Sequence, residues 1–256
     1  QVVGGGLALL VYDAWGWRAA VVMLAACTAV AMVPVLRHRE QEYAPAETRP
    51  AALSRMFGVL SVPGGKRWAL VAVPLVALGS AAVWSLVTPA LVDAGWSLGF
   101  IGTVTSVIAA APALAAALMG GRLCRTRGRG TTLLIGAAIQ LFGGICFVPV
   151  VWSGAELAHG TQVLLGIVGA CCVLAGYTVM NTGIYAVNLG IARPGHAGAD
   201  FTLLSSISML GGTIGASAGL FIAGAGGYGT ALVFGLLVAV AGVVACRTHP
   251  LLSARR

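Results

Sequence analysis

The chain consists of long apolar runs separated by short polar gaps. A helix that crosses a bilayer needs about 20 apolar residues, and charge-free runs of this length follow one another along the sequence. We predict helices at 19–36, 68–92, 97–119, 131–152, 161–187, 201–223 and 229–246. Membrane β-strands alternate apolar and polar residues, whereas these runs are apolar throughout. The pattern therefore predicts an all-α membrane protein.

Two stretches need a closer reading. The run from Phe201 to Cys246 carries no charged residue and is long enough for two spans, and glycines at 224, 226, 227 and 229 supply the break between them. Residues 1–12 are too short to span a bilayer and contain three consecutive glycines. We interpret them as the end of a helix whose beginning is missing, so we expect the chain to be a fragment.

The basic residues fall in every second gap. Fourteen of the fifteen Lys and Arg residues lie in the gaps 37–67, 120–130 and 188–200 and in the tail, whereas the intervening gaps hold only Arg18. Because Lys and Arg are retained on the cytoplasmic side of a bilayer, this alternation indicates a chain that crosses the membrane repeatedly. It predicts that the 37–67 loop and the C-terminus are cytoplasmic.

Composition narrows the classes of function. Charged residues make up 9% of the chain, where a soluble domain carries about 25%. The net charge of +8 is compatible with nucleic-acid binding, but the basic residues adjoin apolar runs and form no aromatic-interleaved patch. We expect contacts with anionic membrane lipid instead and no nucleic-acid partner. The six Cys residues show no metal-ligand spacing, so we expect neither metal nor cofactor.

A weak internal repeat indicates two halves of similar design. Shifting the chain by 211 positions superposes Gly16 on Gly227 and Ala20 on Ala231. In both copies a glycine-rich helix end is followed by a short turn with an aromatic residue and then by a final helix. Together with the charge alternation, the repeat predicts six helices per half, with most of the first half absent from this chain.

A loop motif resembles that of a known transporter family. Residues 121–129 read Gly-Arg-Leu-Cys-Arg-Thr-Arg-Gly-Arg, which resembles the loop motif of the major facilitator superfamily. The matching positions are Gly121, Leu123, Gly128 and Arg129. Arg125 stands where the family has an acidic residue, so the charge-relay role proposed for that acid is not carried over.

The resemblance implies the C-terminal part of a major facilitator fold. Gly16-Trp17-Arg18 is similar to the family's turn into its sixth helix. The implied regions are the end of helix five and helix six of the N-terminal half (1–36), a cytoplasmic loop between the halves (37–67), the C-terminal six-helix bundle (68–246) and a cytoplasmic tail (247–256). A monomeric secondary transporter of the bacterial inner membrane, moving a small polar solute by alternating access, is implied.

A second stretch narrows the resemblance. Residues 193–206, with Gly-Ala-Asp-Phe-Thr-Leu at 198–203, are similar to the loop and eleventh helix of permeases that import siderophores or muropeptide fragments. A siderophore-type importer is our leading hypothesis. A muropeptide permease and a drug or metabolite exporter of the same superfamily stay open as alternatives.

Polar residues on the tenth helix are candidates for a substrate cavity. Tyr177, Asn181, Tyr185 and Asn188 recur at spacings of four, four and three, which gathers them on one helix face. Because a polar group that faces lipid is costly, such groups either line a solute cavity or form hydrogen bonds to neighbouring helices. An interhelical hydrogen bond contributes about 0.6 kcal/mol to helix association. Four such groups exceed what helix association requires, so we favour the cavity.

Further candidates lie on the seventh and eleventh helices. Trp84 and Thr88 share a face of the seventh helix, which lines the cavity in the family. Gly211, Gly215 and Gly219 repeat every fourth residue and form a small face that lets helix backbones approach closely.

Asp200 begins the eleventh helix, where it would cap the first turn or act with Arg193 in a gate. The predicted spans hold no other ionisable residue, so a carboxylate for proton coupling would lie in the missing half.

An intramembrane enzyme is the competing class of function. Intramembrane proteolysis needs a Ser or Asp nucleophile with a His or a second Asp within reach. All four His residues lie in gaps or at span ends and no Asp lies mid-span, so we expect no enzyme. A channel or a structural scaffold stays open, because only accumulation of substrate against a gradient in vesicles excludes both.

The charge alternation makes the sidedness testable. A Cys introduced near Arg127 or in the 37–67 loop should be shielded from a membrane-impermeant thiol reagent added outside intact cells, whereas a Cys beside Asp93 or Glu156 should be labelled. Labelling is compared before and after the cells are permeabilised. Labelling near Arg127 in intact cells would reverse the proposed orientation.

Overall fold

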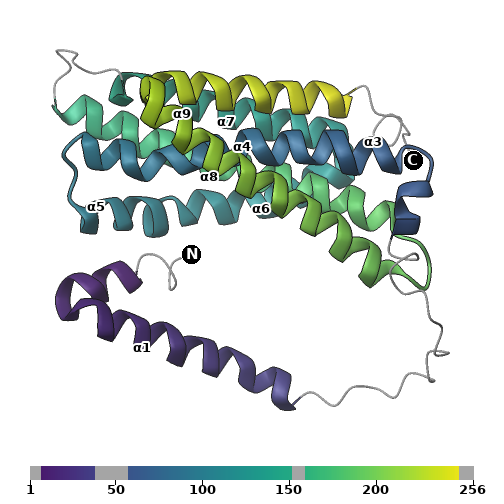
Figure 1. Ribbon diagram of the computed structural model, residues 1–256, viewed down its shortest axis with the longest axis horizontal. Coiled ribbons are helices and arrows are strands. Elements are labelled where there is room, and N and C mark those ends of the chain that lie inside the picture. Colours follow the sequence, from purple (N-terminus) through teal and green to yellow (C-terminus); the bar gives the residue numbers. More distant parts are fainter. Residues whose placement is uncertain (1–6, 38–56, 152–158, 248–256) are drawn as a thin grey trace.

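The computed structural model describes residues 7–37, 57–151 and 159–247, and every regular element among them is helical. The elements are α1 (Ala8–Arg37), η2 (Phe57–Ser61), α3 (Gly65–Arg67), η3 (Trp68–Ala72), α4 (Val73–Asp93), α5 (Leu98–Gly102), η4 (Thr103–Ile108), α6 (Ala110–Thr126), α7 (Arg129–Val151), α8 (His159–Ile191) and α9 (Ala197–Arg247), as shown in Figure 1. The element η2 is a 3-10 helix, and η3 and η4 are π-helical turns that continue into α4 and α6. The all-α prediction is confirmed.

Six stretches of the described residues are long and apolar enough to cross a membrane. Five overlap the first five predicted spans, and the sixth, Ala197–Cys246, holds the last two in 50 residues. A straight helix of that length would be about 75 Å long, more than twice the roughly 30 Å hydrocarbon layer. The helix turns at Gly227, where φ is 82° and ψ is 165°. The predicted glycine break is therefore confirmed, and one of the four glycines makes it.

Gly16 breaks α1 in the same way as Gly227 breaks α9. Its φ is 77° and its ψ is −180°, so the two glycines that the 211-residue shift superposes share nearly one backbone conformation. A residue with a Cβ is strained there, and glycine is not. This match supports the internal repeat and agrees with the predicted turn at residues 16–18.

Helices extend further than predicted in the 120–130 gap and at the end of α8. Helix α6 continues through Thr126 and α7 begins at Arg129, so most of the predicted 120–130 gap is helical, and α8 runs to Ile191 instead of 187. The prediction ended each helix near the last apolar residue. Arg is a good helix former, however, and a helix can continue past the apolar layer into water. The α6–α7 turn is made at Gly128, whose φ is 85°.

The bundle has two chemically different ends. We call one the basic end, because it carries Lys66, Arg67, Arg122, Arg125, Arg127, Arg129 and Arg193. A cluster of buried side chains at this end includes Trp68, Leu133 and Leu204. A second cluster, which includes Leu91 and Phe147, lies at the opposite end, near Asp93.

Helix α4 packs against both legs of α9 through glycines. Along the first leg, residues 197–226, the predicted glycine face lies in the contact, and Gly211, Gly215 and Gly219 oppose Pro74, Leu78 and Ala82 in ascending order. This leg therefore runs parallel to α4. The second leg, residues 228–247, is antiparallel, with Gly235 and Gly242 against Val83 and Val76. Small residues at such contacts let two helix backbones approach closely.

Helices α7 and α8 form a second close pair. Gly136 and Gly143 on α7 and Gly169 and Gly176 on α8 lie against the facing helix, so that an added Cβ would meet its atoms at less than 3.0 Å. This contact was not predicted, because the four glycines stand seven residues apart and are scattered among many others. Together with the α4–α9 contact it builds one bundle.

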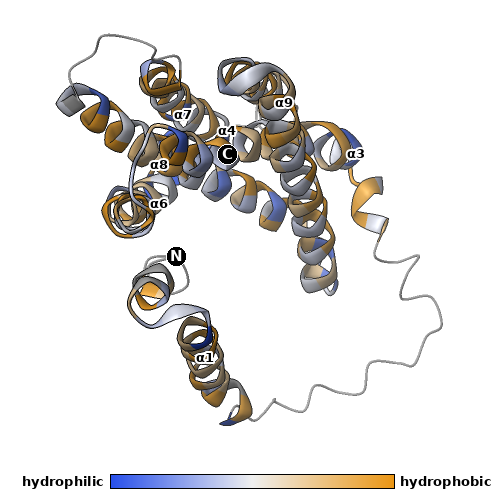
Figure 2. Cartoon of the chain, turned by 60° about the vertical axis from the view of Figure 1, so that its left-hand side comes forward, coloured by the Kyte–Doolittle hydropathy of each residue, from blue (hydrophilic) through white to orange (hydrophobic). Residues whose placement is uncertain are grey.

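Helix α1 lies beside this bundle and contacts α5 (Figure 1). Most of its apolar side chains are exposed, including Trp15 at 75% and Trp17 at 71%. Figure 2 shows apolar residues along α1 and over the outer faces of the bundle, as expected for helices in contact with lipid.

The α4–α9 contact predicts which glycines are irreplaceable. A Cβ on Gly215 would lie 2.6 Å from the Leu78 Cα, so Gly215→Ala should lower the free energy of unfolding by about 1–3 kcal/mol through overpacking. Gly224 has nothing within 4 Å of an added Cβ, so Gly224→Ala is the matched control and should be neutral or slightly stabilising. Thermal unfolding in nanodiscs measures both. Equal stability of the two variants would contradict the contact.

Candidate functional site

Polar side chains from two helices meet in an open groove at mid-bundle. The groove has a volume of about 340 Å³ and lies between α8, the first leg of α9 and α4. The lining residues are Ala77, Ala81, Tyr177, Asn181, Tyr185, Ser205, Ser208, Met209, Gly212, Thr213 and Ala216. The volume falls at the lower end of the range usual for small-molecule sites.

The structure brings three of the four predicted tenth-helix residues into this groove. Tyr177, Asn181 and Tyr185 line it from α8, with the two tyrosines 39% and 44% exposed. Helix α9 contributes Ser205 and Ser208, which were not among our candidates. Their spacing of three would have placed both serines on one helix face, but serine is common in helices of every kind, so the spacing alone is a weak signal.

Five of the six described polar side chains that line the groove make no hydrogen bond, and the sixth, Thr213, bonds the Met209 carbonyl of its own helix. Among the described residues, Tyr177, Asn181, Tyr185 and Ser208 have no side-chain hydrogen bond, and Ser205 Oγ is buried without a partner. In contrast, Ser80 Oγ donates to Gln140 Oε1 at 3.0 Å, and Gln140 Nε2 donates back to the Ser80 carbonyl at 3.4 Å. The Ser80–Gln140 pair bonds helix to helix, and the groove residues do not.

Asn188 lies on the predicted face but outside the groove. Its side chain is fully buried, and its Oδ1 accepts a hydrogen bond of 2.8 Å from Trp68 Nε1 of the π-helical turn before α4. Asn188 lies about one helix turn beyond Tyr185, where the same face of α8 contacts the π-helical segment at Trp68. The predicted polar face of α8 therefore runs from the groove into a contact between helices. Asn188 therefore bonds two helices through its Oδ1, and its Nδ2 is buried without a partner.

Trp84 and Thr88 also lie outside the lining residues. Trp84 packs against the apolar cluster of the opposite end, and Thr88 is exposed. Among the lining residues, α4 contributes only Ala77 and Ala81. Trp84 and Thr88 lie further along the same helix, so the predicted residues are on a helix that borders the groove but beyond the groove itself. The neighbouring Ser85 donates to the Ala216 carbonyl at 3.3 Å and bonds α4 to α9.

A buried ion pair lies at the basic end, below the groove. Asp200 is fully buried, and its two carboxylate oxygens accept hydrogen bonds of 2.7–2.9 Å from the main-chain N–H, Nε and Nη2 of Arg193. The carboxylate thus closes the α8–α9 turn onto α9 and does not cap the first turn of its own helix, which was one of the two roles expected for it; its pairing is with Arg193. These bonds raise the pKa of the Arg193 guanidinium above its ordinary value.

The ion pair connects the groove to the segment before α4. Phe201 follows Asp200, and its ring lies 5.7 Å from that of Tyr185, a groove residue. On the other side, the Arg193 guanidinium covers Gly58 of η2 so closely that an added Cβ would have to displace it. Tyr185 of the groove, the α8–α9 turn and η2 are therefore joined by a continuous chain of contacts.

The predicted loop motif lies at the basic end, on α6, α7 and the turn between them. Gly128 makes the turn, and Arg129 covers Gly190 near the end of α8, with Nη1 2.5 Å from where a Cβ would stand. Arg125 is exposed and Leu123 half-buried. Gly121 has open space around it, and Gly120 instead makes the close approach, to Thr182.

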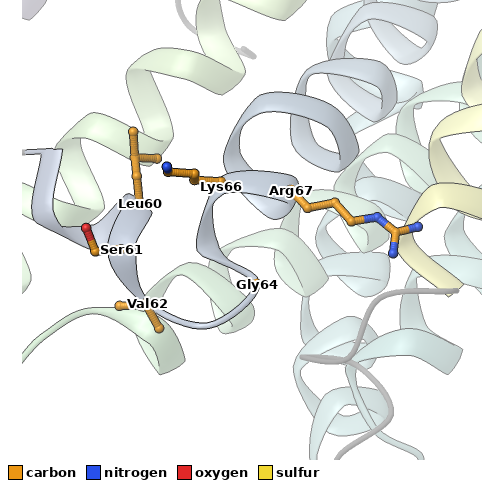
Figure 3. A pocket seen from close by; sticks show the side chains of 6 residues that line it. All are labelled: Leu60, Ser61, Val62, Gly64, Lys66 and Arg67. Atoms are coloured by element: carbon orange, nitrogen blue, oxygen red, sulfur yellow. The ribbon is translucent and has the colours of Figure 1, made fainter.

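Two further features do not join the groove. A wider hollow of about 520 Å³ lies at the basic end, where Leu60, Ser61, Val62, Gly64, Lys66 and Arg67 surround the turn before α4 (Figure 3). At the opposite end, the Tyr228 hydroxyl donates to Asp93 Oδ2 at 2.6 Å and bonds the α9 turn to the end of α4. Within the described ranges, no cluster of three His, Cys, Asp or Glu side chains could hold a metal ion.

The ion pair predicts unequal effects of removing its two members. Arg193→Gln leaves a fully buried carboxylate without its counter-charge, whereas Asp200→Asn leaves a guanidinium that is 27% exposed and can reach water. Arg193→Gln should therefore lower the melting temperature more, because an unpaired buried charge is strongly destabilising. The double variant should recover part of the loss. Additive effects in thermal unfolding would show that the two side chains do not interact.

Sequence comparison agrees with this architecture. The model of the Major Facilitator Superfamily matches residues 1–198. No solved structure matches the chain. The match covers 198 of 256 residues and includes the loop motif and the helices that carry Tyr177, Asn181 and Tyr185. With six membrane-length helices as well, the chain belongs to the Major Facilitator Superfamily, and it is a multi-pass membrane protein of a transporter family.

Proposed function

We propose that the protein is a secondary active transporter that carries a polar small solute by alternating access, and that the groove is one wall of the solute path. The observation that carries this proposal is the set of five unpaired polar side chains facing one groove of about 340 Å³. An unpaired polar group inside a membrane protein is costly. A bound polar solute would satisfy these groups.

The alternative role, hydrogen bonding between helices, is already served by other residues. Gln140 with Ser80 and Asn188 with Trp68 make such bonds, each between two different helices. Thr178 and Thr182 of α8 bond within their own helix, to the Leu174 carbonyl at 2.8 Å and the Thr178 carbonyl at 2.9 Å. Apart from Thr213, which bonds its own helix, the polar groove residues do neither, which favours contact with a solute.

The basic end supports a gate beneath the groove. The Tyr185–Phe201 ring pair closes the groove toward that end, and the Arg193–Asp200 pair holds Phe201 in position. We propose that this unit moves when the path opens to the cytoplasm, where Lys and Arg are retained. Asp200 is neutralised by Arg193, so a proton-binding carboxylate would have to come from the facing half of the transporter.

The leading substrate class is a siderophore taken up through a bacterial inner membrane. Two observations support it. The Gly-Ala-Asp-Phe-Thr-Leu stretch at 198–203 resembles that of siderophore and muropeptide permeases, and it contains Phe201, whose ring packs against that of the groove residue Tyr185. Siderophores also carry several oxygen donors, which hydroxyl and amide groups can bond.

Gene deletion tests the substrate class. Loss of the gene should abolish growth on one siderophore under iron limitation and leave growth in iron-replete medium unchanged. An altered β-lactam induction response without an iron defect would point to muropeptide import. Increased drug sensitivity with normal iron uptake would overturn import in favour of export.

Variants in the deletion strain test the groove. Asn181→Ala should reduce uptake several-fold at normal expression, because the solute loses a hydrogen-bond partner while the protein loses no internal hydrogen bond. Asn181→Leu should reduce it further, since Leu also narrows the groove. Thr178→Ala is the matched control, because Thr178 lies on the same helix but bonds its own backbone. Normal uptake by both Asn181 variants would exclude a role for this wall.

A further inference from the structure

We propose that this wall of the groove binds an uncharged, oxygen-bearing part of the solute, with Ser205 Oγ as a specificity-determining contact. The inference rests on the proposed function, in which the groove lies on the solute path. It adds a statement about charge, which neither the family nor the polar character of the groove determines.

The first argument is the charge of the lining. The eleven described residues that line the groove include no Asp, Glu, Lys, Arg or His. The helices behind them are equally uncharged, since residues 68–92, 160–192 and 201–246 contain none of the four charged residue types. A charged group placed against this wall would therefore find no counter-ion there.

The second argument is that the nearest ion pair offers no net charge. Asp200 lies five residues before Ser205, the first groove residue on α9. Its carboxylate is fully buried, and Arg193 donates hydrogen bonds to both carboxylate oxygens. Asp93 lies at the far end of α4 and accepts from Tyr228. Neither acid is free to pair with a cationic solute at mid-groove.

The physical consequence is selection against charge. Moving a charge from water into an apolar bundle is expensive unless an opposite charge meets it. Hydroxyls and amides cost much less to bury, provided that each finds a hydrogen-bond partner. A wall of unpaired hydroxyl and amide groups thus matches a neutral solute surface that carries hydroxyl, carbonyl or hydroxamate oxygens.

Ser205 is the group most clearly prepared for such a contact. Its Oγ is buried and unpaired while the residue lines the groove, so it carries a desolvation cost that no protein atom offsets. Thr213, further along the same leg, donates its hydroxyl to the Met209 carbonyl at 3.0 Å and keeps only acceptor capacity. Ser205 can both donate and accept, as a hydroxyl or amide oxygen of the solute requires.

The stability of the solute-free protein tests Ser205 without knowledge of the solute. Ser205→Ala removes an unpaired buried hydroxyl, so the melting temperature in nanodiscs should stay equal or rise. Ser80→Ala is the matched contrast, because it removes a buried hydroxyl that bonds Gln140, and it should lower the melting temperature. If Ser205→Ala destabilises as much as Ser80→Ala, Ser205 is a structural residue and the assignment fails.

Thiol reactivity tests the charge selection. The Ser205→Cys variant is placed in nanodiscs, in which reagents reach both faces of the protein. It is treated with three methanethiosulfonates: the hydroxyethyl reagent is neutral, the trimethylammonium-ethyl reagent is cationic and the sulfonatoethyl reagent is anionic. The rate of each reagent is divided by its rate with a free thiol in water. After this normalisation, the neutral reagent should react with the groove cysteine at least about tenfold faster than either charged reagent. Peptide mass spectrometry reads this position separately from the six native cysteines.

The control is Ser97→Cys, an exposed position at the opposite end, where the three normalised rates should differ little. Ser208→Cys replaces Ser205→Cys if the latter does not accumulate as folded protein. Equal or faster reaction of a charged reagent in the groove would overturn the inference while leaving the transport proposal intact. Normal growth of the deletion strain together with a neutral preference would overturn the substrate proposal and leave the charge inference standing.

Discussion

The close approach of α4 to both legs of α9 is the constraint on which the rest of the bundle depends. In a bilayer the hydrophobic effect does not draw helices together, so contact must come from packing and hydrogen bonds. Glycines on α9 supply that packing along both sides of α4, in parallel on one leg and antiparallel on the other. Because the first leg is held in this way, its polar face is turned toward α8, where Ser205 and Ser208 complete the groove begun by Asn181.

Sequence patterns were sufficient for the architecture because the bilayer imposes them. The span lengths follow from the thickness of the hydrocarbon layer. The backbone breaks at Gly16 and Gly227 follow from the freedom of glycine at positive φ. Both features can be predicted from the sequence. The ends of the helices were harder to predict from the sequence. The basic residues of the α6–α7 gap were read as loop, yet water beyond the membrane allows a helix to continue, and Arg does not stop it.

The groove was only partly predictable, because periodicity identifies a face of a helix and not what covers it. Tyr177, Asn181 and Asn188 share a face, but the π-helical turn at Trp68 covers that face one turn below Tyr185, so Asn188 is a helix contact. On α4 the small residues, not the large Trp84, line the groove, since only alanines leave room for it. Ser205 has no periodic signal of its own, and its unpaired hydroxyl is visible only in three dimensions.

The contact between Gly58 and Arg193 has an evolutionary consequence. Any side chain at position 58 would occupy the space of the guanidinium, and a shorter residue at 193 would leave the carboxylate of Asp200 uncovered in an apolar surrounding. Substitution of Arg193 should therefore cost least when Asp200 becomes uncharged at the same time, whereas a small residue at position 58 has only to push aside the end of a flexible side chain. Arg193 and Asp200 are thus expected to be inherited as a pair, and position 58 is freer to vary.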